Sequence, residues 1–407
     1  MANGKLKNSD TLDVSIEKLV YGGEGLARSN GQVVLVPFVL PGERVTVTPE
    51  RVKSGLMRSG RPVVVESSPE RVIPRCEYFF TCGGCQYQHA DYAIQVQQKI
   101  GILRETLLRL GGISYDGEIN VVAGDPWYYR NRIQLHFEDG RSGFHRAGSR
   151  DLCAIDHCYI SSPTLVEVVK RLDQAASEPE WPRFLRSLEV FTNEQEIQLN
   201  VLDTTRPIAA RFFEWGRTFL PPMANGPIEY RAAGRKFQIS RGSFFQVNRF
   251  LIDALVKEVL GERSGKYAID LYAGVGLFSL ALAQRFERTA AVERGGSGYR
   301  DLEVNAARAA TNLAAAKLSA EEFLRGVTEK PDLIVADPPR AGLDRDATAG
   351  LLGVRASSVV LVSCDPSTMS RDLKKLLTLY DIERLTMLDL FPQTYHFETV
   401  VHLRLRQ

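Results

Sequence analysis

Cys364 is the residue of this chain whose neighbours best suit nucleophilic chemistry. An apolar run over residues 359–362 predicts a buried strand that ends at Ser363. A helical pattern starts at Pro366, with Asp365 as its N-cap, so Cys364 lies in a tight strand-to-helix turn. Because a helix N-terminus favours negative charge, we expect this thiol to ionise more readily than a free one. The alternative is a small buried apolar residue, which is how many lone cysteines behave.

A second feature is a glycine turn with an acid before it. A strand ends at Asp270, and Gly274 and Gly276 follow in a turn that leads into a helix. The third glycine of a dinucleotide fingerprint is absent. Glu293 ends the next strand, where a carboxylate can bind both hydroxyls of a ribose. The two acids fit S-adenosylmethionine better than a pyrophosphate cofactor, because its methionine part carries an ammonium group and it has no phosphate to cradle.

Three further side chains are expected at the same cleft. Asp337 follows the fourth strand of the predicted sheet, over residues 332–336, and two prolines after it pin the loop and aim the carboxylate inward. His396 and Glu398 come from the last hairpin. The carboxyl ends of parallel strands share one edge of the sheet, so we expect these groups near Cys364.

A third feature is a C-x5-C-x2-C pattern formed by Cys76, Cys82 and Cys85, with two glycines between the last two. This spacing predicts a metal site, because the glycines let the backbone wrap a bound ion or cluster. A fourth thiolate has to come from Cys153 or Cys158. Zinc and an iron–sulfur cluster both accept four thiolates, so the spacing leaves the metal open.

The predicted elements divide the 407 residues into about three domains. After a polar tail over residues 1–9, about five short strands predict a small OB-like barrel, and a helix over 91–111 follows. From Lys266 onward strands and helices alternate, which predicts a doubly wound parallel sheet. The expected domains are the barrel at 10–67, a central α+β domain with the clustered cysteines at 68–240, and an α/β domain at 241–407 on which the helix over 91–111 can pack.

Composition restricts the class of protein. The net charge of +2 and the pI near 8.1 are mild, so any basic surface has to be a local patch. Two candidate patches are a basic cluster over 51–61 and the aromatic–cationic run over 128–132, which could stack on bases or form an exposed strand edge. The N-terminus lacks an apolar signal segment and no apolar run spans a bilayer, so we expect a cytoplasmic protein without membrane contact.

Taken in order, these segments resemble the RNA 5-methyluridine methyltransferase family over nearly the whole chain. Residues 21–25 and 36–37 resemble a TRAM domain, which implies a module that holds RNA. The other matching segments are the C-x5-C-x2-C run and residues 243–248, 270–276, 337–340, 363–366 and 392–398. The resemblance implies an α/β protein with an N-terminal TRAM barrel, a central iron–sulfur domain and a C-terminal Rossmann-like S-adenosylmethionine methyltransferase domain.

The family's functional residues map onto this chain as follows. Cys364 is implied as the nucleophile that adds to C6 of uracil and Glu398 as the base that removes the C5 proton, with His396 as the alternative base. The matched cofactor-binding positions are Gln246, Tyr272, Glu293 and Asp337. Leu277 departs from the family, which often has a polar residue there.

The resemblance also implies a [4Fe-4S] cluster on Cys76, Cys82, Cys85 and Cys158, with Cys153 as the spare. We expect this cluster to be structural. The implied partner is RNA, with 23S rRNA favoured and tRNA as the alternative substrate, and the protein is expected to be a monomer.

Three other functions fit the sequence less well. A non-catalytic iron–sulfur RNA-binding protein would be expected to lack Cys364 or Glu398, and both are present. Methylation of a base amino nitrogen commonly uses an Asn-Pro-Pro-aromatic loop, whereas residues 337–340 read Asp-Pro-Pro-Arg. DNA cytosine methylation would usually place the cysteine just after a proline, which is not the case for Cys364.

Overall fold

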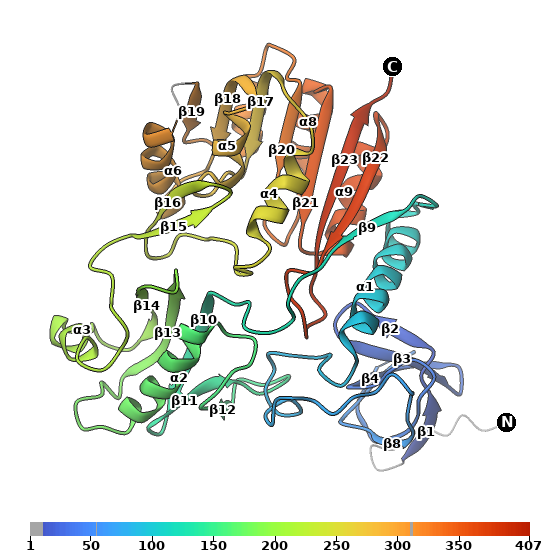
Figure 1. The fold of residues 1–407 in the computed structure, drawn as a ribbon. Coiled ribbons are helices and arrows are strands. Elements are labelled where there is room, and N and C mark those ends of the chain that lie inside the picture. The colour runs from blue at the N-terminus through green and yellow to red at the C-terminus, as the bar shows by residue number, and fades with distance from the viewer. Residues whose placement is uncertain (1–10, 54, 310–311) are drawn as a thin grey trace. The chain divides into compact units, whose positions relative to one another are not determined.

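The structure is a computed structural model that describes residues 11–53, 55–309 and 312–407 (Figure 1). The polar tail predicted over 1–9 lies outside these residues. The chain forms two compact units. Unit 1 consists of Met1–Ile102, Phe144–Cys153 and Phe391–His396, and unit 2 of Leu103–Gly143, Ala154–Leu390 and Phe397–Gln407. Within the described ranges, no helix combines the length and the apolar character needed to span a bilayer.

Unit 1 contains a small β-structure built from two sheets. The three-stranded sheet has the order β1-β5-β8 and the five-stranded sheet has the order β2-β3-β4-β7-β6. The strands are β1 (Leu12–Ser15), β2 (Lys18–Val20), β3 (Glu24–Ser29), β4 (Gln32–Pro37), β5 (Arg44–Val47), β6 (Pro49–Lys53), β7 (Leu56–Ser59) and β8 (Val63–Glu66). Valines with Ile16, Ala27 and Met57 fill the core between them. The sequence predicts fewer strands because short polar ones such as β6 lack apolar alternation.

Part of the basic cluster over 51–61 is already engaged inside unit 1. Arg58 forms an ion pair with Glu24 at 2.6 Å, and the guanidinium of Arg61 lies 3.8 Å from the ring centroid of Phe80. These contacts leave a smaller free basic surface than the sequence alone indicates.

The helix predicted over 91–111 is present as α1 (Tyr92–Thr106), continued by a π-helical turn, η1 (Leu107–Gly111). It ends where Gly112 adopts a left-handed φ of 66° and its N–H bonds back to the helix. In unit 2, η1 packs against α9 (Pro366–Leu376), and a Cβ added at Gly111 would lie 3.2 Å from the Ser370 carbonyl oxygen.

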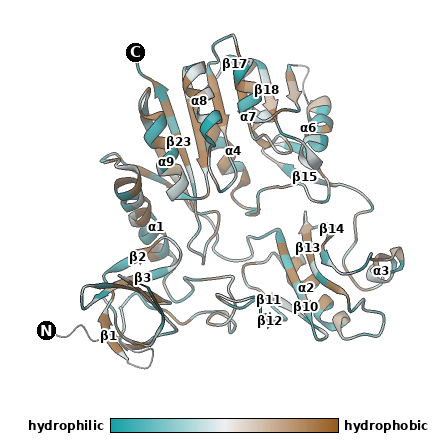
Figure 2. Cartoon of the chain, turned by 180° about the vertical axis from the view of Figure 1, so that it is seen from behind, coloured by the Kyte–Doolittle hydropathy of each residue, from teal (hydrophilic) through white to brown (hydrophobic). Residues whose placement is uncertain are grey.

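The main feature of unit 2 is an eight-stranded sheet of order β19-β18-β17-β20-β21-β23-β22-β9. Its strands are β9 (Ile119–Val122), β17 (Gly265–Leu271), β18 (Phe286–Val292), β19 (Leu313–Ala316), β20 (Leu333–Ala336), β21 (Ser358–Ser363), β22 (Tyr380–Leu388) and β23 (Glu398–Leu405). The first five strands of this order are parallel, and β23 is antiparallel to both of its neighbours. All residues of β20 are buried, and the sheet's central strands are largely hydrophobic (Figure 2). Apolar runs buried on both faces are typical of parallel strands.

The edge strand β9 was not expected in this sheet, because its residues fall within the predicted central domain. It pairs in parallel with β22, from Leu385 opposite Ile119 to Leu388 opposite Val122. The helices that alternate with the sheet strands are α4 (Ile252–Leu260), α5 (Leu277–Leu282), α6 (Gly296–Ala309), α7 (Ala320–Arg325), α8 (Arg345–Val354) and α9.

The rest of unit 2 contains a five-stranded antiparallel sheet of order β12-β11-β10-β13-β14 and the hairpin β15-β16. The ends of β11 and β12 extend into unit 1. The elements are β10 (Arg132–Glu138), β11 (Arg141–His145), β12 (Leu152–Ala154), α2 (Pro163–Ala176), β13 (Leu185–Thr192), β14 (Ile197–Thr204), α3 (Ala210–Gly216), β15 (Ile228–Ala232) and β16 (Arg235–Ile239). In the run over 128–132, Tyr129 and Asn131 are fully buried, so neither forms an exposed strand edge or a platform for bases.

Candidate active site

The predicted site residues of unit 2 gather at the carboxyl edge of its eight-stranded sheet. Strands β17, β20 and β21 are parallel neighbours, so the residues that follow them emerge together. Strand β23 runs in the opposite direction and begins at this edge. Ser363 pairs with Thr399, which places the next residue of one strand and the preceding residue of the other, Cys364 and Glu398, opposite each other.

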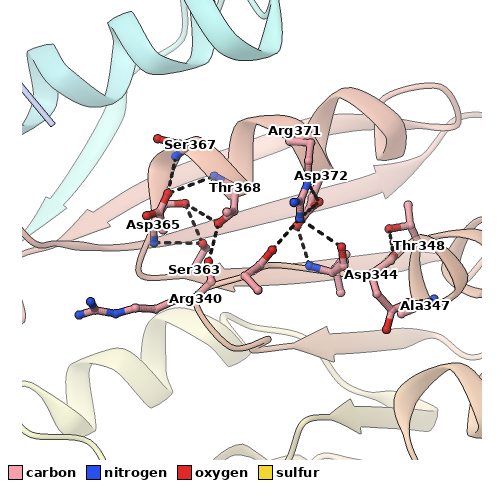
Figure 3. A network of polar contacts seen from close by, with 12 residues as sticks. Arg340, Asp344, Ala347, Thr348, Ser363, Asp365, Ser367, Thr368, Arg371 and Asp372 are labelled. Atoms are coloured by element: carbon pink, nitrogen blue, oxygen red, sulfur yellow. Dashed lines mark hydrogen bonds and ion pairs between the residues drawn. The ribbon is translucent and has the colours of Figure 1, made fainter. Parts of the chain in front are cut away.

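The turn that carries Cys364 has the predicted local structure. Asp365 caps α9 by accepting hydrogen bonds from the backbone N–H groups of Ser367 at 2.8 Å and Thr368 at 3.1 Å (Figure 3). Pro366 occupies the first helical position. These short-range contacts fix where the strand ends and therefore where the thiol stands.

The electrostatics of Cys364 differ from the expectation. Burial first, and then the charges of Glu398 and Asp337, raise the pKa of this thiol to about 11, although Arg340 acts in the opposite direction through its charge and a side-chain hydrogen bond. The prediction of an easily ionised thiol is therefore wrong for the free protein. The main reason is burial, which disfavours the charged thiolate, and the neighbouring acids Glu398 and Asp337 oppose a further negative charge. In addition, Asp365 already uses the N–H groups at the helix N-terminus.

The two carboxyl groups that face Cys364 also hold their protons unusually tightly. Glu398 is 5% exposed, and burial together with the charge of Asp337 raises its pKa well above the ordinary value, while Arg340 lowers it. Burial raises the pKa of Asp337 to about 7. Glu398 Oε1 is buried and has no hydrogen-bond partner in the described part of the chain. An unpaired buried oxygen beside the thiol fits a group that meets its partner on the substrate.

The glycine turn provides the space for a cofactor. Gly274 has a left-handed φ of 56°, and a Cβ added there would meet nothing within 4 Å. Its N–H donates to Glu293 Oε2 at 2.9 Å, which links the turn to the acid after β18. Tyr272, a non-glycine residue, has a φ of 60°, a conformation that is costly and is often found at functional sites.

Asp270 lies beneath this turn. Its side chain is fully buried, and its Oδ2 accepts a hydrogen bond from the Ser279 hydroxyl. Its Oδ1 is buried without a partner among the described residues, and burial raises the pKa of the carboxyl to about 7. Leu277, the departure from the family, is 7% exposed at the start of α5, so its side chain packs in the protein.

Gln246 is held by residues that the sequence analysis did not single out. Its backbone oxygen accepts from Asn131 Nδ2 at 3.0 Å. Ser243 lies upstream in the same loop, and its hydroxyl donates to Asp301 on α6 at 2.6 Å. From the same helix, Asn305 Nδ2 donates to the Val275 carbonyl of the glycine turn at 2.9 Å. Asp301 and Asn305 are buried and one helical turn apart on α6. The spacing of these two polar residues, four positions apart on a predicted helix, is the feature of the sequence from which their shared role could have been predicted.

His396, the alternative base, belongs to unit 1. Its ring lies 4.0 Å from that of Tyr395 and 5.9 Å from that of Phe391, measured between centroids. Glu398, by contrast, belongs to the same unit as Cys364. The structure therefore groups the predicted nucleophile with Glu398.

The clustered cysteines form a tight loop in unit 1. The Gly84 N–H points at Cys82 Sγ over 3.4 Å, and the Cys82 N–H donates to the Tyr78 carbonyl at 2.7 Å. Cys76, Cys82 and Cys85 are half-buried. Nevertheless, across residues 11–53, 55–309 and 312–407 no set of three or more His, Cys, Asp or Glu side chains is arranged to hold a metal ion. The loop has the thiol donors and the N–H···S contact that a thiolate site needs.

The two candidates for the fourth thiolate differ in environment. Cys153 is buried, and burial raises the pKa of its thiol. Cys158 is half-buried and lies in the loop before α2.

Comparison with known proteins identifies the family. A family model described as tRNA (Uracil-5-)-methyltransferase matches residues 227–406, and the TRAM domain model matches residues 5–61. The chain is 32% identical to the 23S rRNA (uracil(1939)-C(5))-methyltransferase RlmD of Enterobacter sp. (strain 638), over 94% of each protein. This chain belongs to the RNA (uracil-5-)-methyltransferase family. It is also 31% identical to an uncharacterized RNA methyltransferase of Aquifex aeolicus, covering 97% of this chain and 99% of the relative.

A solved member of the family has the same fold. The crystal structure of the Pyrococcus abyssi tRNA (uracil-54, C5)-methyltransferase in complex with S-adenosyl-L-homocysteine superposes with a TM-score of 0.74 at 26% identity, covering 96% of this chain and all of that one. The protein is thus an RNA (uracil-5-)-methyltransferase that uses S-adenosylmethionine, with an N-terminal TRAM domain and a C-terminal methyltransferase domain. The predictions of family, enzyme class, methyl donor and RNA as substrate class are confirmed.

Proposed function

We propose that this enzyme methylates C5 of one uridine in 23S rRNA through a covalent bond between Cys364 and C6 of the base, with Glu398 as the base that removes the C5 proton. The observation that carries the proposal is the opposition of Cys364 and Glu398 at the adjoining ends of β21 and β23. The pair presents a sulfur and a carboxyl group to one substrate base.

The proposed reaction needs both groups, because C5 of uracil is a weak nucleophile. The deprotonated Cys364 sulfur forms a bond to C6, and the electrons of the C5=C6 bond move toward O4, which makes C5 an enolate carbon. S-adenosylmethionine supplies the methyl group on a sulfonium, and the carbon–sulfur bond of that sulfonium breaks as C5 takes the methyl. Glu398 then accepts the C5 proton, the C5=C6 bond re-forms and Cys364 leaves as a thiolate.

The cofactor is proposed to lie over the glycine turn. Gly274 and Gly276 leave backbone room, and Glu293 is placed to bind the ribose hydroxyls. Asp270 offers a buried, unpaired oxygen below the turn. Gln246, Tyr272 and Asp337 complete the proposed cofactor site.

Ribosomal RNA is the favoured substrate because a relative that matches along nearly the whole chain is named for 23S rRNA and because the TRAM domain is present. A tRNA uridine is the second candidate, supported by the whole-chain similarity to the Pyrococcus abyssi enzyme. A monomer is proposed for both.

We further propose that Cys76, Cys82 and Cys85 bind a structural [4Fe-4S] cluster with Cys158 as the fourth ligand. The Gly84 N–H directed at Cys82 Sγ supports this, because such donors stabilise thiolates bound to clusters.

We also propose three domains, at residues 10–67, 68–240 and 241–407. One amendment is needed, because β9 lies within 68–240 in the sequence but belongs to the sheet of the methyltransferase domain.

The proposal is tested with RNA that contains 5-fluorouridine, together with S-adenosylmethionine. Fluorine at C5 cannot leave as a proton does, so the wild type is expected to form an adduct that persists in denaturing electrophoresis. Cys364→Ala should form none. Glu398→Gln should accumulate an adduct even with ordinary RNA, because proton removal is slowed by about 10²–10⁴-fold. Mass mapping of the trapped RNA distinguishes 23S rRNA from tRNA. An adduct that persists in Cys364→Ala would contradict the assignment of the nucleophile.

A further inference from the structure

Within the described residues, the positive charge of Arg340 acts on the thiol of Cys364. Its side chain hydrogen-bonds to the thiol, and it also faces Glu398. The other charged groups facing the sulfur are carboxyls, Glu398 from β23 and Asp337 from the loop after β20. Asp365, the adjacent residue, points its carboxylate at the first turn of α9. A thiolate formed here would therefore be stabilised by Arg340 and opposed by two acidic groups.

We propose that Arg340 is a catalytic residue that stabilises the Cys364 thiolate, and that α9 holds it in position through hydrogen bonds to the loop over residues 340–343. The proposal rests on the assignment of Cys364 as the nucleophile. It assigns Arg340 a role in the reaction and assigns α9 the role of holding Arg340 in position.

The loop that carries Arg340 has little freedom of its own. Two prolines precede Arg340, and the Gly342 N–H donates to the Pro339 carbonyl at 2.7 Å, which closes a tight turn. Gly342 has a left-handed φ of 76°, and a Cβ added there would collide with the side chains of Asp372 and Arg371 on α9. The loop therefore lies directly on the helix.

Side chains of α9 hold each peptide of this turn (Figure 3). Thr368 Oγ1 donates to the Arg340 carbonyl at 3.1 Å. Arg371 Nη2 donates to the carbonyls of Ala341 at 2.8 Å and Leu343 at 3.1 Å. The buried carboxylate of Asp372 accepts from the Leu343 N–H at 2.8 Å and from Arg371 Nε at 2.9 Å.

This network explains why the cation and the thiol stay together. The same helix begins at the turn that carries Cys364 and binds the loop that carries Arg340. Any shift of α9 moves both groups, so their contact is kept. Arg340 is otherwise exposed, which lets the guanidinium remain hydrated while the thiol is protonated.

The test measures Cys364 alone, in the free protein. Full-length wild type, Arg340→Gln and Arg340→Lys are treated with iodoacetamide at pH 8.5, and alkylation of the Cys364 peptide is followed by mass spectrometry. Because alkylation requires the thiolate, the rate in Arg340→Gln should fall about tenfold, as expected for a pKa higher by about one unit, and Arg340→Lys should recover part of it. The matched control is Arg345→Gln, an exposed arginine on α8, which should react like the wild type.

A second variant tests the support. Arg371→Gln loses the bonds to Ala341 and Leu343 and should slow Cys364 alkylation in the same direction, by about two- to fivefold, while the protein stays folded by circular dichroism. Unchanged alkylation in Arg340→Gln would overturn the proposal. If this variant lost only RNA affinity, Arg340 would be a phosphate contact instead. Neither result depends on adduct formation with 5-fluorouridine RNA, so failure of the proposed function would be seen separately.

Discussion

Burial, more than formal charge, controls protonation at the carboxyl edge of the sheet. Desolvation is the largest cause of the raised pKa of Cys364, Glu398, Asp337 and Asp270. Burial therefore favours the protonated form of each group, and for Cys364 and Glu398, the proposed nucleophile and base, this is the form without the active charge. We infer that RNA and cofactor complete the electrostatics of this site, and that Arg340 is its built-in positive charge.

Asp270 provides a stability prediction at the scale of one residue. The pKa of its carboxyl is about 7 in the folded protein against 3.8 for the ordinary group. The folded state therefore keeps a proton that the unfolded chain loses near pH 4. This contribution to stability is fully present below about pH 4 and is lost as the pH rises to about 7, for a total of about 4 kcal/mol at about 1.4 kcal/mol per unit.

Asp270→Asn should remove that dependence. The difference in unfolding free energy between the variant and the wild type should move in favour of the variant by a few kcal/mol from about pH 4 to about pH 8, measured by urea denaturation at each pH. The exposed Asp116→Asn serves as control. A constant difference across this range would show that Asp270 is not a buried, protonated acid.

At the scale of elements, short connections decide where chemistry occurs. The turn between β21 and α9 presents Cys364, the turn after β17 presents the cofactor space, and the loop after β20 presents Arg340. In unit 1, three of the proposed cluster ligands also lie in a short connection, in which the Gly84 N–H points at Cys82 Sγ. Rigid strands and helices on either side leave these loops few conformations.

The cysteine loop leads to a prediction about metal content. Protein purified without oxygen should contain about four iron and four sulfide ions per chain and show the visible absorbance of a bound cluster. Cys82→Ser should lose both iron and absorbance, whereas Cys153→Ser should retain them. One zinc per chain without sulfide would favour a zinc site, and the absence of any metal would contradict the proposed cluster. Loss of iron should lower stability or RNA binding and leave the chemical step unchanged.

At the scale of the whole molecule, the two units are interleaved along the chain. Phe391–His396 belongs to unit 1, although the residues on both sides of it belong to unit 2. A reciprocal pair holds this segment: Gln95 Nε2 donates to Gln393 Oε1 at 3.0 Å, and the Gln393 N–H donates to Gln95 Oε1 at 3.0 Å. Gln393 keeps a left-handed φ of 69°, and its carbonyl accepts from two further N–H groups. Residues nearly 300 positions apart thus stabilise one unit.

Gln95→Ala tests this long-range support. The change leaves buried polar groups of Gln393 without partners, so the free energy of unfolding should fall by about 1–3 kcal/mol. Gln97→Ala, an exposed position on the same helix, should change it by less than about 0.5 kcal/mol. Both values come from guanidinium denaturation. Equal small effects would mean that the Gln95–Gln393 pair contributes little to unit 1.

The sequence by itself determined the elements that depend on neighbouring residues. Asp365 and Pro366 mark the start of α9, Gly112 ends the helix that begins at Tyr92, and the apolar runs of β20 and β21 predict buried parallel strands. Capping, turn formation and hydrophobic periodicity act over a few residues, so they can be read from the chain. The order of the motifs also determined the family.

Tertiary structure decided what depends on groups distant in the sequence. Only the folded chain adds β9 to the edge of the sheet, buries Tyr129, and directs Asp301 to the loop before Gln246. It also reverses the expected ionisation of Cys364. Desolvation and the charges that face a group come from the packing of separate strands, and local sequence contains no record of them.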